Sequence, residues 1–314
     1  MGKENKKTIL VTGALGHIGS RLIREFSPKV VGRVIILDNL STQRYSSLFD
    51  LPGSMKYEFH EEDIRTVDFS KYLNGVDAVI HLAAITDAPS SSDHPEETFD
   101  VNLNGTKRVA EACLAANVPI LFPSTTSVYG SQANLVDETS QELKPQSPYA
   151  DSKIQAEAYL RGLKAKGLRF VICRFGTIFG YSIGMRFHTA VNKFSWQAVM
   201  GIPVTVWKTA WKQRRPYLDL KDCVSAVNFI LEKNIFDGEI YNVLTKNFTV
   251  EDIVTTIQKF VPDLKVSYVD SAIMNQLSYD VSDAKFRALG FAPAGDLTKG
   301  IEETISRLGG VRAV

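Results

Sequence analysis

Residues 8–19 read TILVTGALGHIG, an apolar, β-branched run that leads directly into three glycines spaced GxxGxxG. The run predicts a buried strand, and the residues after the glycines predict a helix to about residue 26. In a strand–turn–helix of this kind, Gly13 allows the tight turn, Gly16 lets the backbone approach a pyrophosphate, and Gly19 lets the helix pack closely. The stretch therefore predicts the first βα unit of a dinucleotide-binding sheet.

Apolar runs and helix-like stretches continue to alternate through the first half of the chain. Strands are expected at 34–38, 77–84, 118–124 and 168–175, and helices at about 95–117 and 148–166. The first of these helices opens at Pro95, and the second has Ser147 as its cap and Pro148 at its first position. Continuous apolar strands alternating with helices predict an α/β fold, a Rossmann-like doubly wound parallel sheet covered on both faces.

The pattern changes after about Phe175. Further elements are expected at 187–200 (helix), 204–207 (strand), 216–244 (strand, helix, strand), and 250–261 and 297–308 (helices). We therefore expect a dinucleotide-binding domain over residues 1–177, to which the chain returns at about 216–244. A smaller, discontinuous α+β lobe over residues 178–314 is expected to bind the substrate.

The bulk composition excludes several classes of protein. The 314 residues carry 36 Lys plus Arg against 35 Asp plus Glu, which gives a formal charge of +1. This balance lacks the excess of positive charge that binding to nucleic acid or to an anionic membrane requires. The three cysteines lack a CxxC pair or a histidine at ligand spacing, which argues against a disulfide framework and a metal site. The charged start MGKENKK precedes a strand rather than an apolar signal segment, so a cytoplasmic location is expected.

The end of the second strand bears on the choice of cofactor. Asp38 could accept hydrogen bonds from both hydroxyls of an adenosine ribose and would repel a 2′-phosphate, which favours NAD over NADP. The alternative is that Asp38 is only a turn residue before Asn39. After the third strand, Asp63-Ile64 could place a carboxylate beside the adenine amine, and a solvated acidic turn explains the same letters equally well.

A phenol and an ammonium group lie four residues apart in Tyr149-Ala-Asp-Ser-Lys153, on one face of a predicted helix. A neighbouring Lys⁺ and an oxidised nicotinamide both favour the phenolate of a tyrosine. Tyr149 could then accept a proton from an alcohol while a hydride leaves the same carbon. The spacing alone is common on helices, and its significance comes from the upstream glycine loop and the hydroxyl-rich strand end that accompany it.

Six segments carry a resemblance to a known family. They are GxxGxxG at 13–19, Asp38-Asn39-Leu40, HLAA at 81–84, NLNGT at 102–106, STTSVYG at 124–130 and YADSK at 149–153. Together they resemble the extended short-chain dehydrogenases/reductases that act on nucleotide sugars, among them UDP-galactose and UDP-glucuronate 4-epimerases. The resemblance covers the first 180 residues well and the remainder loosely.

The resemblance implies NAD as cofactor and a role for each matching position. Tyr149 resembles the acid/base of the family, Lys153 the residue that binds the nicotinamide ribose, and Thr125 the hydroxyl that orients the reacting oxygen. Asn102 resembles a buried asparagine beside the cofactor-binding loops, and a structural role at a helix bend is equally open for it. The implied cofactor contacts also include His17, Ile18, Asn39, Leu82, Ala83 and Ala84.

Departures from the family pattern bear on the reaction. The similar dehydratases carry an Asp-Glu pair directly after the catalytic threonine, and the similar decarboxylases keep a glutamate at the position of Ser127. This chain has Thr126-Ser127 there, and neither side chain can do carboxylate proton chemistry. We therefore expect an epimerase that oxidises a nucleotide sugar at C4 and reduces it from the other face. Dehydratase, decarboxylase and 4-ketoreductase activities are the alternatives, and intact Tyr149, Lys153 and Thr125 argue against a module that only senses NAD.

Hydroxyl side chains and one arginine are candidates for contacts with the sugar. Thr125, Thr126, Ser127 and Thr177 could surround a polar C6 group, and Arg186 could pair with the carboxylate of a uronate. The alternative is that Thr126 and Ser127 cap a turn and that Arg186 is solvated.

The nucleotide end is assigned by resemblance. Arg215, in RPYLDLKD, resembles a family arginine that meets the substrate pyrophosphate, and Asn192 could also reach the phosphates. The loop 207–215 gathers basic residues and two tryptophans that could stack on a base, or it is a solvated loop with Trp207 in the core. The resemblance further implies UDP as the nucleotide and a homodimer formed through the helices at about 95–117 and 148–166.

Overall fold

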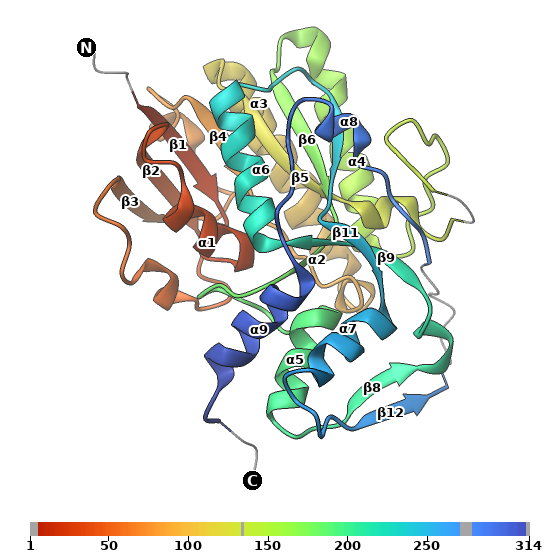
Figure 1. The fold of residues 1–314 in the computed structure, drawn as a ribbon. Coiled ribbons are helices and arrows are strands. Elements are labelled where there is room, and N and C mark those ends of the chain that lie inside the picture. Colours follow the sequence, from red (N-terminus) through yellow and green to blue (C-terminus); the bar gives the residue numbers. More distant parts are fainter. Residues whose placement is uncertain (1–5, 133–134, 271–277, 312–314) are drawn as a thin grey trace.

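The structure, a computed structural model of the chain, describes residues 6–132, 135–270 and 278–311 (Figure 1). A seven-stranded sheet has the strand order β10-β6-β5-β4-β1-β2-β3, and all of its neighbouring strands are parallel. Its strands are β1 (Lys7–Thr12), β2 (Val31–Asp38), β3 (Lys56–Glu61), β4 (Ala78–His81), β5 (Ile120–Thr125), β6 (Phe170–Phe175) and β10 (Ile240–Val243). The predicted α/β, Rossmann-like fold is confirmed.

Helices cover both faces of this sheet, which is why its central strands are apolar throughout. Two of them, α1 (His17–Glu25) and α6 (Leu220–Lys233), pack on one face, where Leu22, Val227 and the inward residues of β1 and β6 form one core. On the other face, α3 (Thr106–Ala116) and α4 (Pro148–Leu163) bury Cys113 and Leu160 in a second core. Burying apolar surface on both sides stabilises the parallel arrangement.

The long helix that the sequence predicts from Pro95 is present, but a π-helical turn interrupts it. It consists of α2 (Pro95–Phe99), the π-turn η4 (Asp100–Gly105) and α3. Gly105 lets the π-turn pack closely against Ile64, since a β-carbon there would lie 2.5 Å from the Cδ1 atom of Ile64 and would require that side chain to move. Single π-turns within helices are frequent at functional sites, and this one carries Asn102.

The second half of the chain forms a smaller lobe. It contains the sheet β11-β9-β7 and the pair β12-β8. Its elements are β7 (Thr177–Phe179), α5 (Ala190–Val199), β8 (Val204–Trp207), β9 (Arg214–Asp219), β11 (Lys246–Thr249), α7 (Val250–Gln258), β12 (Val266–Val269) and α9 (Leu297–Leu308). Phe179, Ile253 and Ile301 are fully buried in the core of this lobe. The lobe lies below the large sheet in Figure 1.

The strand–helix–strand at 216–244 is divided between the two units. As the sequence predicts, α6 packs on the large sheet and β10 pairs with its strand β6. The strand β9 instead pairs with β11 and β7 in the small sheet. Its Leu218 nevertheless packs into the core beneath α6, so β9 connects the two units. Short α8 (Ala284–Arg287) then packs near β10.

The remaining short elements are 3₁₀ turns. They are η1 (Tyr45–Leu48), η2 (Phe69–Lys71), η3 (Ser90–Ser92), η5 (Thr126–Tyr129), η6 (Lys164–Lys166) and η7 (Lys208–Ala210). Within the described ranges, none of the helices combines the length and the hydropathy needed to cross a membrane.

Candidate active site

The structure brings Tyr149, Lys153 and Thr125 together where the first turns of α4 face the end of β5. Ser147 caps α4 by accepting a hydrogen bond from the amide of Ala150 at 3.2 Å, which fixes the start of the helix. The Tyr149 phenol is hydrogen-bonded to the Thr125 hydroxyl. The Lys153 ammonium donates to the carbonyl of Pro123, two residues before Thr125 in β5, at 3.0 Å. The three side chains therefore form one constellation at the carboxyl edge of the sheet.

The environment of this constellation shifts the pKa of both ionisable groups. Burial raises the pKa of Tyr149, while the hydrogen bond from Thr125 and the positive charge of Arg186 oppose the rise. Burial lowers the pKa of Lys153 to about 8, against the opposing charge of Glu157 one helical turn further along α4. At neutral pH the lysine therefore retains its proton and the site retains a positive charge beside the phenol.

The glycines of the loop allow close packing between the end of β1, the start of α1 and the segment after β4. Gly13 has φ +65°, and a β-carbon on it would lie 2.5 Å from the amide nitrogen of Ala83. Gly19 has no space either, because its β-carbon would lie 2.5 Å from the carbonyl oxygen of Ala14. Helix α1 begins after Gly16 without a side-chain cap and without an acidic residue in its first turn. These features suit the phosphates of a dinucleotide.

Asp38 lies beside this loop, at the end of β2. Its carboxylate accepts hydrogen bonds from the amides of Leu15 and Leu40, each at 3.0 Å, and it is half-buried. Next to it, the Asn39 amide donates to Asp63 at 3.1 Å. Asp38 is therefore held by the glycine loop itself, which is more than a simple turn residue requires.

Asp63 and Ile64 follow β3, and each makes contacts within the protein. Arg65 donates to the Asp63 carboxylate at 2.7 Å, and this pairing holds the pKa of the carboxyl well below its usual range. Asp63 is thus paired with Arg65 and partly exposed, and its contact with the adenine amine stays a prediction. Ile64 is buried in the core against the π-turn, so its side chain is not available to a ligand.

A chain of hydrogen bonds connects the glycine loop to α4, the helix that carries Tyr149 and Lys153. His81 Nδ1 lies 2.7 Å from the Thr12 hydroxyl, and its Nε2 lies 3.0 Å from the Thr106 hydroxyl. Thr106 donates to the carbonyl of Asn102 at 2.6 Å, so His81 Nε2 carries the ring proton and Nδ1 accepts. In the sequence, His81 and Thr106 appear only as parts of the segments at 81–84 and 102–106, and Thr12 only as part of the first strand.

Asn102 completes this chain of hydrogen bonds. Its side-chain amide exchanges hydrogen bonds with the backbone of Ile85, at 2.8 and 2.9 Å, and donates to Ser152 of α4 at 3.2 Å. The loop that continues β4 through Leu82, Ala83 and Ala84 is thereby fixed against the helix of Tyr149. These contacts favour the structural reading of Asn102.

His17 connects the glycine loop to the smaller lobe. Its Nε2 lies 2.9 Å from the carbonyl oxygen of Gly180, and burial lowers its pKa to about 4. Ile18, the next residue, is half-buried against the core beneath α1. A neutral His17 at the helix start leaves the adjacent amides as the groups that face a ligand.

Tyr279 is another residue of this site that the sequence did not reveal. Its phenol is hydrogen-bonded to the hydroxyls of Thr126 and Ser127, in η5 directly after Thr125. Its own amide donates to the carbonyl of Arg214 at 3.0 Å, which ties it to the small sheet. Because Tyr279 lies more than a hundred residues beyond the motif it contacts, in an irregular segment, no spacing or periodicity could have indicated it.

The other predicted substrate residues surround this end of the site. Thr177 is half-buried at the start of β7. Arg186 is partly buried and close enough to Tyr149 for each charge to shift the pKa of the other. Burial and the nearby Arg44 lower the pKa of Arg186, while Asp87 opposes this effect. Arg186 is therefore not the fully solvated residue of the alternative reading.

Asn192 and Arg215, the two residues predicted to contact phosphates, lie in different environments. The Asn192 amide accepts from the nitrogen of Gly180 at 3.1 Å and donates to the carbonyl of Arg186 at 3.2 Å. This fully buried side chain holds the loop that presents Arg186, and its contact with the substrate phosphates stays a prediction. Arg215 is half-buried on β9, and its charge lowers the pKa of Tyr279 against the effect of burial. It therefore faces the same site.

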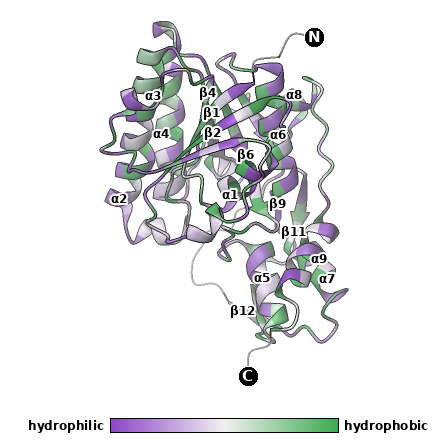
Figure 2. Cartoon of the chain, turned by 90° about the vertical axis from the view of Figure 1, so that its left-hand side faces the viewer, coloured by the Kyte–Doolittle hydropathy of each residue, from purple (hydrophilic) through white to green (hydrophobic). Residues whose placement is uncertain are grey.

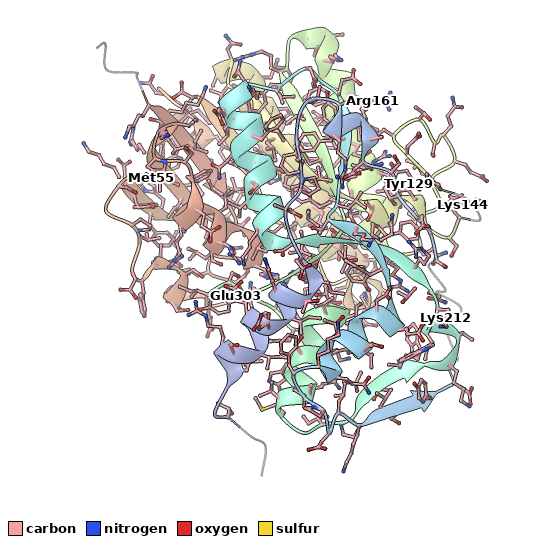
Figure 3. All side chains as sticks on the ribbon, viewed as in Figure 1. Met55, Tyr129, Lys144, Arg161, Lys212 and Glu303 are labelled. Carbon is pink, nitrogen blue, oxygen red and sulfur yellow. The ribbon has the colours of Figure 1, made fainter. Side chains whose placement is uncertain are left out.

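The basic loop at 207–215 is largely neutralised by acidic partners. Lys208 pairs with Asp270 at 3.0 Å, Lys212 pairs with Glu251, and Arg214 pairs with Asp280 at 2.8 Å. Lys212 lies at the periphery of the small lobe in Figure 3. Trp207 is 39% exposed, which argues against the alternative that places it in the core.

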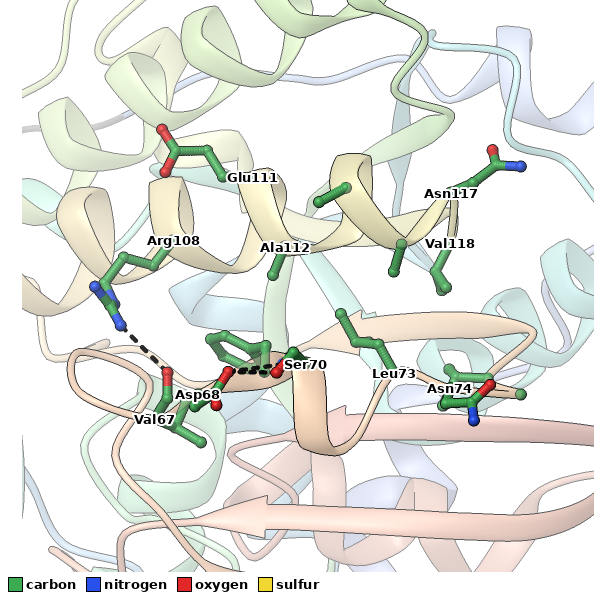
Figure 4. A pocket seen from close by; sticks show the side chains of 15 residues that line it. Val67, Asp68, Ser70, Leu73, Asn74, Arg108, Glu111, Ala112, Asn117 and Val118 are labelled. Atoms are coloured by element: carbon green, nitrogen blue, oxygen red, sulfur yellow. Dashed lines mark hydrogen bonds between the residues drawn. The ribbon is translucent and has the colours of Figure 1, made fainter.

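One hollow of about 740 Å³ lies away from these residues, between the turn at 67–76 and α3 (Figure 4). Arg108 crosses its mouth to donate to the carbonyl of Val67 at 3.2 Å. None of the predicted site residues lines it. Among the residues described, no group of three or more His, Cys, Asp or Glu side chains is arranged to hold a metal ion.

Comparison with known proteins agrees with this geometry. The sequence pattern of the "NAD dependent epimerase/dehydratase family" matches residues 9–243. The chain is 30% identical to a Bacillus subtilis protein named "Uncharacterized UDP-glucose epimerase YtcB", over 96% of this chain and 97% of that protein.

Solved structures give the same result. A UDP-glucuronic acid 4-epimerase from Bacillus cereus, in complex with NAD, is 25% identical with a TM-score of 0.84, covering 96% of this chain and 98% of that one. A UDP-glucose 4-epimerase from Thermus thermophilus, also in complex with NAD, is 27% identical with a TM-score of 0.82, covering 97% and 100%. The chain therefore belongs to the NAD dependent epimerase/dehydratase family, and NAD is its cofactor.

Proposed function

We propose that the chain epimerises a nucleotide sugar at C4, through a keto-sugar that is formed and then reduced from its opposite face. The observation that carries this proposal is the hydrogen bond between Tyr149 and Thr125, next to hydroxyl residues instead of carboxylates. Tyr149 interacts with Thr125, Arg186 and Tyr279, and the two positions after Thr125 are Thr126 and Ser127 rather than carboxylates.

Each residue of the constellation has a task in this reaction. Thr125 orients the C4 hydroxyl, and the Tyr149 phenolate accepts its proton as the C4–H bond is broken. Bound NAD supplies the hydride acceptor at that carbon and later the hydride donor. The ammonium group of Lys153 stabilises the phenolate and holds the cofactor ribose. When the keto-sugar has turned, Tyr149 returns the proton to the new alkoxide, so that protons and electrons balance.

Dehydration is the main alternative within the same family. It requires an acid to protonate a leaving hydroxyl and a base for the adjacent carbon. The two positions after Thr125 are occupied by Thr126 and Ser127, whose hydroxyls are hydrogen-bonded to Tyr279. These groups support polar contacts with the sugar and favour epimerisation over dehydration or decarboxylation.

We further propose that the C6 group of the sugar is a carboxylate, as in a uronate. Arg186 supports this because its charge acts on Tyr149 and because, among the ion pairs of the described residues, it has no carboxylate partner. Arg215 is the candidate for the substrate pyrophosphate, and UDP is the nucleotide that the relatives' names favour. The cofactor would then occupy the large sheet unit and the nucleotide sugar the smaller lobe at 178–314.

We also propose a homodimer formed through α2–α3 and α4. The helices α3 and α4 lie side by side on one flank of the molecule, with hydrophobic residues among polar ones (Figure 2). A cytoplasmic location is proposed as well, since Cys113, Cys173 and Cys223 are buried free thiols, which suits a reducing compartment.

The test is an incubation with catalytic NAD and a panel of UDP-, dTDP-, GDP- and CDP-sugars in D₂O, followed by proton NMR. We expect one sugar to interconvert with its C4 epimer without gaining deuterium at carbon. A uronate substrate should lose activity in Arg186→Met far more than a neutral hexose does. Incorporation of deuterium at carbon, or loss of water or CO₂, would contradict the epimerase proposal.

A further inference from the structure

A turn that follows β2 is fastened to the glycine loop by buried hydrogen bonds. Ser47, fully buried in η1, donates from its hydroxyl to the carbonyl of Leu15 at 2.9 Å. Arg24 of α1 donates to the carbonyls of Ser47 at 2.9 Å and Ser20 at 2.7 Å. Because these bonds join backbone to backbone through side chains, the turn keeps a fixed position relative to the glycines.

Arg44 immediately precedes η1 on this turn and reaches back over the glycine loop. Its Nη1 atom lies 3.9 Å from the position that a β-carbon would occupy on Gly16. Gly16 is also the residue before α1, where the helix amides lack a side-chain cap. The guanidinium and the start of the helix therefore border the same space from two sides.

The charges around this space favour an anion. Burial lowers the pKa of Arg44, and the Asp38 carboxylate, which opposes the shift, already accepts hydrogen bonds from the amides of Leu15 and Leu40. Arg44 in turn lowers the pKa of His17 and of Arg186. Neither Arg44 nor Arg186 takes part in an ion pair within the described ranges. Two partly buried guanidinium groups without such partners are costly unless a ligand supplies the negative charge.

We propose that Arg44 binds the pyrophosphate of NAD, opposite the amides at the start of α1. The proposal rests on NAD being the cofactor and adds a cation to a site where the glycine motif offers only backbone amides. A planar guanidinium can give two parallel hydrogen bonds to phosphate oxygens. A 2′-phosphate is disfavoured as the partner, because it would lie against the Asp38 carboxylate rather than over Gly16.

The test compares ligands that share adenosine but differ in phosphate. The full chain, freed of bound nucleotide, is titrated calorimetrically with NAD and ADP-ribose, and with adenosine in competition. We expect Arg44→Met to weaken binding of NAD and ADP-ribose by about tenfold or more, the usual effect of losing a charged hydrogen bond, and to leave adenosine unchanged. Arg44→Lys should show an intermediate loss. The matched control is Arg33→Met, which removes a guanidinium on β2 that is paired with Glu58 on β3. This variant should bind all three ligands normally.

The outcomes separate the possible roles of Arg44. Equal losses for adenosine and ADP-ribose would overturn the proposal by showing that Arg44 shapes the adenosine pocket. Unchanged ADP-ribose binding in Arg44→Met would overturn it outright. Failure of the unaltered chain to bind ADP-ribose would instead contradict the assignment of the cofactor. Epimerase activity is not needed for any of these readouts, so the proposed reaction is tested separately.

Discussion

Glu157 of α4 and Arg174 of β6 form a buried ion pair between the helix and the sheet. Arg174 Nη2 lies 2.7 Å from Glu157 Oε2, and the two side chains are 4% and 5% exposed. Arg174 also donates to the Tyr129 hydroxyl at 3.0 Å, and Ser124 donates to Glu157. Tyr129 is labelled in Figure 3 and is fully buried. The pair therefore joins α4 to β5, β6 and η5, the elements that carry Lys153 and Thr125.

Breaking this pair should destabilise the fold strongly. Arg174→Met leaves the Glu157 carboxylate buried without its partner, and removing one member of a buried pair typically costs about 3–5 kcal/mol. Urea denaturation of both proteins would measure the difference in the free energy of unfolding. The control is Arg33→Met, which breaks an exposed pair with Glu58 and should cost at most about 1 kcal/mol. Equal losses in the two variants would refute a structural role for the buried pair.

The buried imidazole of His81 should make the fold sensitive to acid. Burial lowers the pKa of His81 to about 3, below the value near 6.5 of the unfolded chain. Between these two values only the unfolded chain takes up the proton, so stability is lost as the pH falls through 6.5. From pH 7 to pH 5 this group alone should reduce the free energy of unfolding by about 2 kcal/mol.

Denaturation at both pH values would measure the loss for the wild type and for His81→Gln. Glutamine keeps a donor and an acceptor for Thr106 and Thr12 but does not titrate, so its stability should depend less on pH. If the two proteins lose the same stability between pH 7 and pH 5, His81 is not the source of the acid sensitivity.

Removing the hydroxyl of Tyr149 should abolish turnover and leave NAD binding intact. Tyr149→Phe retains the ring in its partly buried position but cannot exchange a proton with the sugar, and such groups contribute about 100-fold or more to rate. NAD affinity should change little, since Lys153 and the glycine loop are intact. The matched control is Tyr159→Phe on the same helix, whose hydroxyl bonds to Glu111 away from the site. Substantial residual epimerisation in Tyr149→Phe would mean that another group is the acid/base.

Local signals in the sequence were sufficient for several features of the cofactor half of the site. The cap of Ser147, the helix spacing of Tyr149 and Lys153, and the close approach at Gly13 each depend on residues within a few positions or on one βα unit. The family resemblance then supplied the role of Thr125. Such features are predictable because backbone sterics and helix geometry fix them before any tertiary contact is made.

Other features of the site depended on contacts between distant segments. Asn192 looked like a polar residue available to a ligand, yet it holds the backbone of Gly180 and Arg186. The π-turn at 100–105 keeps the helical pattern of polar and apolar residues, so periodicity predicts one continuous helix across it. Arg44 lies in a polar turn whose letters resemble any surface loop, and only the fold places it over Gly16.

Tyr279 should control how well the sugar is held rather than the chemistry itself. Its hydroxyl bonds to Thr126 and Ser127 but not to a group that exchanges a proton in the proposed reaction. In Tyr279→Phe those two hydroxyls lose a shared partner and become free to rotate, which weakens their contacts with the substrate. A neutral hydrogen bond contributes about 1 kcal/mol, so KM should rise severalfold while kcat changes less. Steady-state kinetics on the preferred nucleotide sugar would measure both. Tyr268→Phe, at an exposed tyrosine packed edge-on against Trp211, is the matched control and should leave both constants unchanged. A fall in kcat as large as that of Tyr149→Phe would instead place the Tyr279 phenol in the proton-transfer chemistry.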